Sequence, residues 1–150
     1  MKELTGTASA TTAAAPDAAM ALLEAIDGYP RWTPEVVKSA EVLERDGSGH
    51  PTRARTRLHV ERGPLTRDFD LLFDVKVDPG GTVALKRTPH EASDKERFDV
   101  TWKVGGGQST RIELQLAANL DVPRLIPLGS VGDAMAADLL SAATRALASS

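Results

Sequence analysis

The sequence predicts an α+β fold in which a curved antiparallel sheet of about seven strands wraps around a long C-terminal helix. Apolar and polar residues alternate with period two from residue 36 to residue 116, and turn signals divide this stretch into strands. A long amphipathic stretch follows residue 121. Because one such helix cannot bury its apolar stripe alone, we expect it to pack across the apolar face of the sheet. We expect residues 1–150 to form a single domain.

The N-terminal segment predicts a strand over residues 4–12, a helix over 16–26 and a turn over 29–34. Pro16 and Asp17 are typical of a helix start, and Asp27 with Gly28 is typical of a helix end. The apolar residues between them fall at helical spacing: Ala19, Leu22, Leu23 and Ile26. Residues 29–34 read Tyr-Pro-Arg-Trp-Thr-Pro, and two prolines do not fit a regular helix. We therefore expect an anchored turn there.

The clearest predicted strand covers residues 52–61, where alternate positions carry apolar and basic side chains. A hairpin around Gly63 and Pro64 would place three oppositely charged pairs on its outer face: Arg57 with Asp70, Arg53 with Asp74, and His59 with Asp68. Such pairs contribute roughly 0.2–1 kcal/mol each and help to fix the register. The interleaved acids cancel the positive potential that phosphate binding requires, so this face does not predict a nucleic-acid surface.

The last third of the chain predicts the long helix. The strand pattern stops after Asp121, and Pro123 and Pro127 frame the entry to the helix. Its predicted apolar stripe consists of Leu128, Val131, Met135, Leu139 and Ala142.

Composition excludes several classes of site and partner. Hydrophobic residues make up 41% of the chain and the formal net charge is −3, which is ordinary for a globular protein and unlike a polyanion-binding one. The chain has no cysteine, so disulfides and thiolate sites are excluded. The Ala-rich residues 8–25 are interrupted by Pro16, Asp17 and Glu24, unlike a secretory signal. We expect a soluble cytoplasmic protein, a monomer or homodimer, with no nucleic-acid partner and no integral membrane segment.

No cofactor or metal is predicted. His50 and His90 lie in turns and His59 lies on an outward strand face, so their spacing does not converge on a metal ion. The glycines at 105–107 are followed by strand residues rather than by a lysine and a helix. They predict a hairpin turn, not a phosphate-binding loop.

The order of elements resembles that of the SRPBCC superfamily, the START-like proteins related to the birch-pollen allergen, and in particular its polyketide cyclase/dehydrase-like branch. The most specific local match is the turn at 29–34, which is similar to a tyrosine-proline-x-tryptophan turn of that branch. Trp102, the turn at 105–107 with Thr110 and Arg111, and the proline-bearing entry to the last helix also match. The resemblance implies a helix-grip fold, with two short helices after the first strand.

The resemblance also implies an internal apolar cavity between the sheet and the C-terminal helix. Members of the superfamily use it for lipids, sterols, polyketides or isoprenoid quinones, and some catalyse cyclisation or dehydration. There is no universal catalytic motif to carry over, so the catalytic residues stay unknown. We expect the cavity to be lined by residues of the inner sheet face and of the helix stripe: Arg67, Phe69, Phe73, Leu85, Arg87, Glu96, Phe98, Trp102, Leu114, Met135 and Leu139.

Three charged residues in this set lie on the apolar side of their strands. Arg67 shares the parity of Phe69, while Arg87 and Glu96 could meet across a hairpin. A charge at such a position must be paired or reach solvent. Two interpretations follow. Either these side chains pair with one another or reach solvent at strand ends, or they orient a carboxylate, phosphate or phenolate of a ligand.

Three functions are compatible with these observations. The first is binding or carriage of a hydrophobic small molecule without catalysis. The second is a cyclase or dehydratase in which Arg67, Arg87 or Glu96 polarises a carbonyl or moves a proton. The third is an interaction module whose cavity is filled by its own side chains. The alternating pattern serves an open cavity and a packed core equally well, so it does not separate them.

Overall fold

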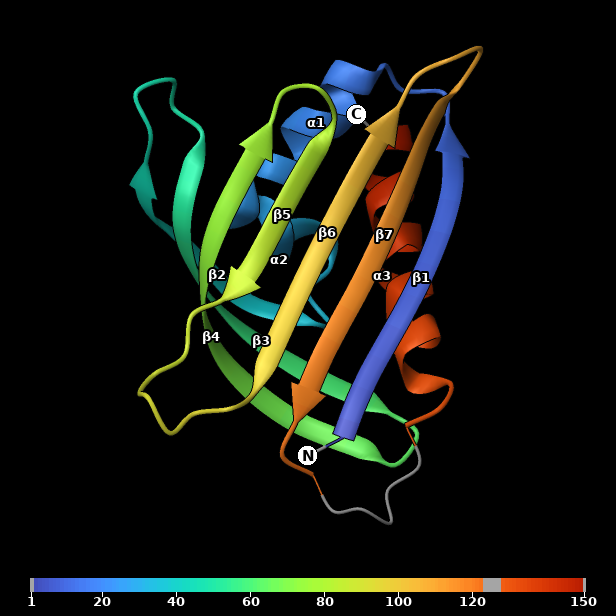
Figure 1. Cartoon of the computed structure of the whole chain (residues 1–150). Coiled ribbons are helices and arrows are strands. Elements are labelled where there is room, and N and C mark those ends of the chain that lie inside the picture. The colour runs from blue at the N-terminus through green and yellow to red at the C-terminus, as the bar shows by residue number, and fades with distance from the viewer. Residues whose placement is uncertain (1, 123–127, 150) are drawn as a thin grey trace.

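Seven antiparallel strands form one sheet in the spatial order β1-β7-β6-β5-β4-β3-β2, so that the first strand pairs with the last (Figure 1). The structure is a computed structural model that describes residues 2–122 and 128–149. Its strands are β1 (Lys2–Thr12), β2 (Val37–Arg45), β3 (Pro51–Arg62), β4 (Leu65–Asp78), β5 (Thr82–Arg87), β6 (Arg97–Gly105) and β7 (Thr110–Leu120). Its helices are α1 (Pro16–Glu24), the 3-10 turn η1 (Ile26–Gly28), α2 (Tyr29–Trp32) and α3 (Val131–Ala148). The predicted architecture is confirmed.

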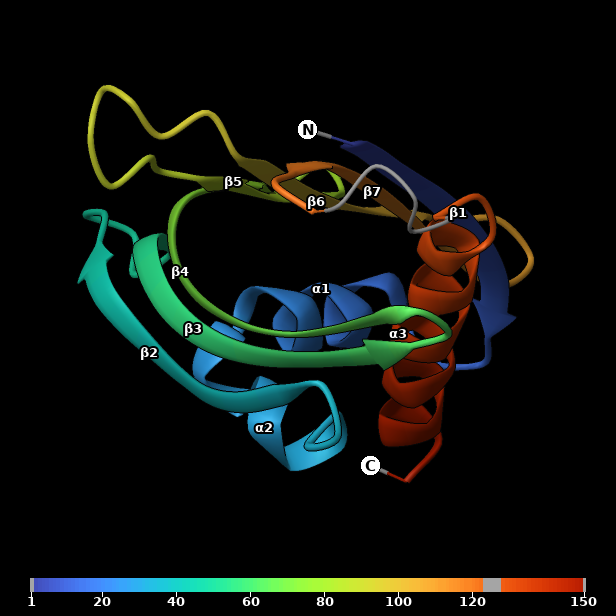
Figure 2. The same ribbon diagram turned by 90° about the horizontal axis from the view of Figure 1, so that it is seen from below.

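The sheet curves strongly. Figure 2 shows it bending through β4, so that β2 and β3 lie opposite β6 and β7, with α1 between the two halves. Helix α3 packs chiefly on β1 and also contacts β7 and β3. It therefore closes the side of the fold where the two halves of the sheet face each other. The buried core fills the space inside this arrangement.

The segment after β1 is more helical than the sequence predicts. The first helix ends at Glu24 rather than at residue 26, and residues 29–32 form the short helix α2 instead of a turn. Pro30 stands in the first turn of α2, where its missing N–H costs no helical hydrogen bond. The Tyr29 hydroxyl donates to the main-chain oxygen of Leu23 at 2.5 Å, which ties α2 to α1.

Helix α3 buries a broader face than the predicted stripe. Leu128, Val131, Met135 and Ala142 are buried, whereas Leu139 is only half-buried. The prediction missed five further buried positions: Gly132, Ala136, Leu140, Ala143 and Leu147. The stripe is wide because α3 contacts strands on two sides of the fold. The predicted entry at Pro123 and Pro127 lies outside the described residues.

The start of α3 lies directly against the edge strand β1. A Cβ atom on Gly6 or on Gly132 would overlap the main chain of the opposing element, so glycine is required for this approach. Asp133 Oδ1 accepts a hydrogen bond from the Thr7 N–H at 3.0 Å. The helix thus covers this edge of the sheet and satisfies part of it.

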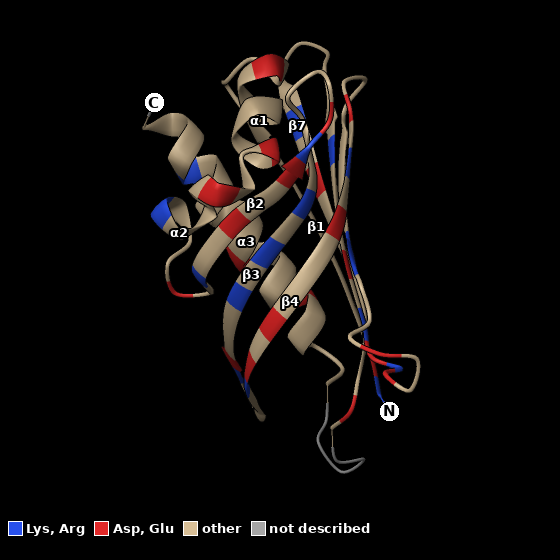
Figure 3. Cartoon of the chain, turned by 90° about the vertical axis from the view of Figure 1, so that its left-hand side faces the viewer, with Lys and Arg blue, Asp and Glu red and all other residues tan. Residues whose placement is uncertain are grey.

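The register of the β3–β4 hairpin is the predicted one, with Arg57 opposite Asp70, Arg53 opposite Asp74 and His59 opposite Asp68. Figure 3 shows the resulting bands on the outer face, basic on β3 and acidic on the flanking β2 and β4. One contact crosses the strands diagonally: Arg55 stands opposite Leu72, but its guanidinium donates two hydrogen bonds to Asp70, at 2.9 and 2.6 Å. The outer face therefore neutralises its own charge.

Candidate functional site

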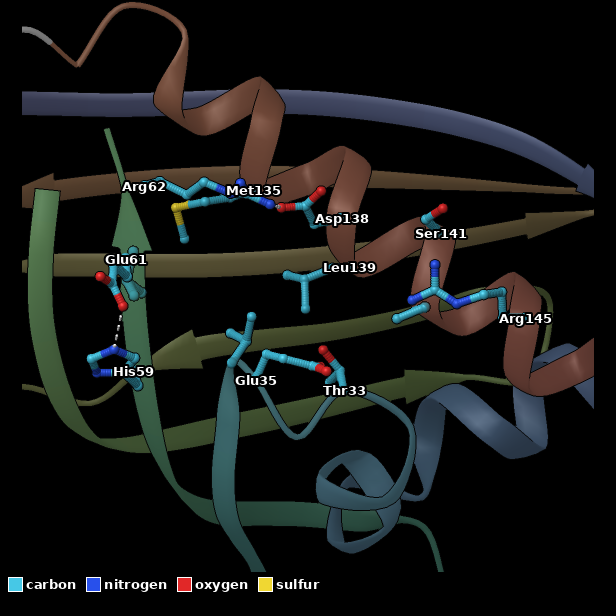
Figure 4. A pocket seen from close by; sticks show the side chains of 13 residues that line it. Thr33, Glu35, His59, Glu61, Arg62, Met135, Asp138, Leu139, Ser141 and Arg145 are labelled. Carbon is cyan, nitrogen blue, oxygen red and sulfur yellow. Dashed lines mark hydrogen bonds and ion pairs between the residues drawn. The ribbon is translucent and has the colours of Figure 1, made fainter. Parts of the chain in front are cut away.

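A pocket of about 420 Å³ opens where α3 faces the end of β3 (Figure 4). Strand β2 begins at Val37, opposite Leu58, so residues 60–62 of β3 extend beyond it without a partner on that side. The segment 33–36, which leads from α2 into β2, forms another wall. The pocket exists because β2 is too short to cover β3 and α3 stands across the remaining gap.

The inner surface of the pocket is apolar. Leu139 and Met135 come from α3 and point toward β3 (Figure 4). Val60, Val36 and Ala142 complete this surface from β3, from the segment before β2 and from the next turn of α3. These aliphatic groups favour the apolar part of a ligand, since its transfer from water would bury both surfaces.

At one end of the pocket the charged side chains are already paired. Arg62 forms an ion pair with Asp138 of α3. The two nitrogens of the His59 ring lie 2.6 Å from Asp68 and 3.3 Å from Glu61. Hydrogen bonding to Asp68 and then to Glu61 raises the pKa of His59, because both carboxylates favour the imidazolium form. With both nitrogens engaged, His59 has no free position at which to take a proton from a ligand.

At the other end the polar side chains have no partner in the part of the chain that the structure describes. Thr33 and Glu35 project from the segment before β2, and Ser141 and Arg145 project from successive turns of α3 (Figure 4). Within the described residues, none of these four side chains forms a hydrogen bond or ion pair. The pocket is therefore amphipathic, with an apolar floor and one end where donors and acceptors are available.

Arg67 and Glu96, two of the charged residues expected at the cavity, bind each other. Two hydrogen bonds join them, from Nη1 to Oε2 at 2.6 Å and from Nη2 to Oε1 at 2.7 Å. The guanidinium also lies 4.5 Å from the centre of the Phe69 ring. Glu96 Oε2 accepts a further bond from the Asp121 N–H at 2.8 Å. The Arg67 guanidinium lowers the pKa of Glu96, so the pair is ionised at neutral pH.

Arg87 is bound even more completely. Its guanidinium donates to Asp94 Oδ1 at 3.1 Å and Oδ2 at 2.5 Å, and to the main-chain oxygen of Glu96 at 2.8 Å. The Arg87 side chain is only 5% exposed. Arg87 and Glu96 thus meet as the sequence predicts, but through the main chain of Glu96, while Asp94 supplies the carboxylate. The two arginines fasten the segment 88–96 to the sheet rather than facing the pocket.

The apolar residues expected to bind ligand divide into two groups. Met135 and Leu139 line the pocket. The others lie in the packed core: Phe69, Phe73, Leu85, Phe98, Trp102 and Leu114. The rings of Phe69 and Phe73 meet that of Phe98 edge-on, with centroids 5.6 and 6.3 Å apart, so aromatic groups fill this part of the interior. Their contact with a ligand stays a prediction.

Sequence reasoning missed most of the pocket. Thr33, Glu35, Ser141 and Arg145 were not among the candidates, although Ser141 and Arg145 stand at helical spacing beside the predicted stripe. That spacing is the signal that could have found them. No comparable signal marks Thr33 or Glu35, because their position depends on where β2 begins.

A shallower groove of about 890 Å³ adjoins the pocket along α1, α2 and the end of α3. Ala142 and Arg145 line both hollows. Arg145 therefore stands at the boundary between the pocket and a more open surface.

Residues 2–122 and 128–149 bring together no group of three His, Cys, Asp or Glu side chains that could hold a metal ion. Among the helices in these same ranges, none is long and apolar enough to cross a membrane.

Comparisons with solved structures place the fold in a well-populated group. A START superfamily protein from Mycobacterium smegmatis is 16% identical, with a TM-score of 0.71 over 95% of this chain and 93% of that one. A protein from Thermus thermophilus is 22% identical, with a TM-score of 0.71 over 97% of each chain. The di-domain ARO/CYC StfQ from the steffimycin biosynthetic pathway is 18% identical, with a TM-score of 0.61 over 97% of this chain and 49% of that one.

A search of curated protein sequences found no match. The family model described as polyketide cyclase / dehydrase and lipid transport matches residues 12–145. This match runs from the end of β1 to the last turns of α3 and so includes every wall of the pocket. The resemblance found in the sequence is confirmed, and the chain belongs to the polyketide cyclase / dehydrase and lipid transport family.

Proposed function

We propose that this chain binds an amphipathic small molecule in the pocket between α3 and β3, with the apolar part of the ligand against Leu139, Met135 and Val60. The observation that carries the proposal is the pocket itself, in a member of a family described by cyclisation, dehydration and lipid transport. Its volume of about 420 Å³ falls within the range of roughly 300–1,000 Å³ that is usual for small-molecule sites.

Binding is better supported than catalysis. A cyclase or dehydratase needs an acid, a base or a polarising group beside its substrate. Arg67, Arg87 and Glu96 are held in ion pairs and hydrogen bonds away from the pocket, and both nitrogens of His59 are occupied. Of the three carboxylates in the pocket wall, Glu61 and Asp138 are paired with His59 and Arg62. The third, Glu35, is exposed, and no hydrogen bond from a described residue positions it.

Fluorescence titration with Nile red, a neutral dye that responds to apolar surroundings, tests the proposal. The wild-type chain should bind the dye saturably and one to one. Leu139→Trp places extra volume on the pocket floor and should weaken binding about tenfold. Leu43→Trp is the matched control, because Leu43 is 44% exposed on β2 and does not line the pocket.

Equal weakening in the two variants, or none in either, would show that the dye binds elsewhere. Thermal melting of both variants establishes that they are folded. If several lipid and aromatic ligands also fail to displace the dye, the proposal is wrong and the interior serves only as a packed core.

A further inference from the structure

The unpartnered end of the pocket carries one positive and one negative group. Arg145 comes from α3 and Glu35 from the segment before β2, so they stand on different walls at the same end (Figure 4). Within the described residues, neither side chain takes part in an ion pair. The hydroxyls of Thr33 and Ser141 lie on the same two walls and also lack protein partners among those residues.

This arrangement contrasts with the rest of the molecule. Charges at the opposite end of the pocket are joined as Arg62 with Asp138 and as His59 with Glu61. A ligand that reached those groups would first have to break a bond within the protein. A ligand that reaches Glu35 and Arg145 displaces only water, so these two residues can make new hydrogen bonds at lower cost.

The pair of charges discriminates between head groups. A carboxylate would gain a hydrogen-bonded partner in Arg145 but would be repelled by Glu35, and an ammonium group would meet the reverse. A hydroxyl group both donates and accepts, so it can bond to a carboxylate or to a guanidinium and is repelled by neither Glu35 nor Arg145. Hydrogen bonds to charged groups are stronger than those between neutral groups, and a neutral head group loses less hydration on entry.

We propose that the pocket selects ligands with a neutral, hydroxyl-bearing head group, and that Glu35 and Arg145 together set this preference. The inference rests on the proposed function, since it concerns the polar end of the same pocket. The apolar tail lies on Leu139 and Met135, and the hydroxyl reaches the end of the pocket that carries Glu35 and Arg145, where the hydroxyls of Thr33 and Ser141 also stand.

Displacement of Nile red by three ligands of equal chain length tests this proposal: decan-1-ol, decanoate and decylammonium. At pH 7.5 the wild-type chain should bind the alcohol about tenfold more tightly than either ion. Glu35→Gln removes the repulsion and should tighten decanoate by about fivefold to tenfold. Arg145→Met should tighten decylammonium by a similar factor. The two substitutions thus move the preference in opposite directions.

Two control variants make the same change of net charge away from the pocket. Arg31→Met removes an exposed arginine from α2 that lines only the adjoining groove. Glu91→Gln removes an exposed carboxylate from the segment 88–96. Neither should alter the order of the three ligands.

The outcomes separate this proposal from the proposed function. If the three ligands displace the dye with equal affinity, or if the controls shift the preference as much as the test variants, the head-group proposal is wrong while binding in the pocket stands. If Glu35→Gln and Arg145→Met both weaken every ligand equally, the two residues act by packing or folding and not by selection. If no ligand displaces a dye that binds saturably, the proposed function itself fails.

Discussion

The arginines beside the segment 88–96 and the arginine near the end of α3 differ in what surrounds them. Arg67 and Arg87 each donate at least two hydrogen bonds to a carboxylate, and both fasten separate parts of the chain. Arg145 faces a pocket and has no partner among the described residues. The first two charges are satisfied by the fold, whereas the third is the one that we propose for a ligand. For Arg67 and Arg87, inward parity left both pairing and ligand binding open. The structure shows the pairing, and their contact with a ligand stays a prediction.

The largest expected effect is on stability, when each of two adjacent leucines on α3 is replaced. One leucine lies in the filled core and the other in the open pocket. Leu140 is 3% exposed in the core, while Leu139 is half-buried on the pocket floor. Leu140→Ala should lower the free energy of unfolding by about 3–4 kcal/mol, because the surrounding core relaxes only partly around the cavity. Leu139→Ala should cost about 1 kcal/mol, since a side chain on an open pocket floor leaves no closed cavity behind. Urea denaturation followed by tryptophan fluorescence measures both.

Phe73→Ala provides a reference from the opposite side of the core, where Phe73 is 2% exposed. It should cost about as much as Leu140→Ala or more. If Leu139→Ala and Leu140→Ala lowered the free energy of unfolding equally, the pocket would have to close around Leu139 in solution. The pocket floor would then not differ from the packed core.

These leucines also show what the sequence could predict and why. Strand alternation depends only on which residues face inward, so the β3–β4 register followed from parity and from one turn. The face of a helix depends on how many elements pack against it. Leu140 is buried because α3 packs on β1 and β7 as well as facing the pocket. The predicted stripe allowed for one packing side only, so it included Leu139 and omitted Leu140.

Two further features could not be read from local pattern. Parity placed Glu96 near Arg87, but it did not indicate that the Glu96 carboxylate binds Arg67. Asp94 lies in an irregular segment, so no periodicity indicates that it turns back to Arg87. Pro30 was interpreted as a helix breaker, but its place in the first turn of α2 makes it compatible with a helix. Both depend on where neighbouring elements begin and end.

Arg67 and Arg145 should also differ in how much they stabilise the fold. Arg67→Met should lower the free energy of unfolding by about 1–3 kcal/mol, because it leaves the half-buried Glu96 without its cationic partner. Arg145→Met should change stability by less than about 0.5 kcal/mol, since no hydrogen bond or ion pair with a described residue is lost. Denaturant unfolding of the two variants measures the difference.

Arg67→Lys is the control for charge without geometry. A lysine keeps the positive charge but cannot donate two parallel bonds to one carboxylate, so it should recover only part of the loss. Full recovery would assign the effect to charge alone. A destabilised Arg145→Met variant would show that Arg145 has a structural role and would weaken its assignment to a ligand.

The smallest expected effect is a loss of stability in acid that originates at Glu96 and Asp94, the carboxylates paired with Arg67 and Arg87. Hydrogen bonds from Arg67 lower the pKa of Glu96, and hydrogen bonds from Arg87 lower the pKa of Asp94. A carboxyl group whose pKa is lower in the folded state adds stability above its unfolded pKa of roughly 4, and this contribution disappears as pH falls toward the folded value. Glu96 and Asp94 should thus leave the melting temperature unchanged from about pH 7 to pH 5. Below about pH 4 their protonation should lower it.

Two glutamate variants locate the origin of this acid loss. Glu96→Gln should lower the plateau of the melting temperature and make the acid fall shallower, because its amide does not titrate. Glu35→Gln in the pocket should leave the shape of the profile unchanged. Within the described residues the Glu35 carboxylate forms no hydrogen bond that protonation could break. If the two variants flatten the acid limb equally, the paired and unpaired carboxylates do not differ in solution and the contrast between the two regions is lost.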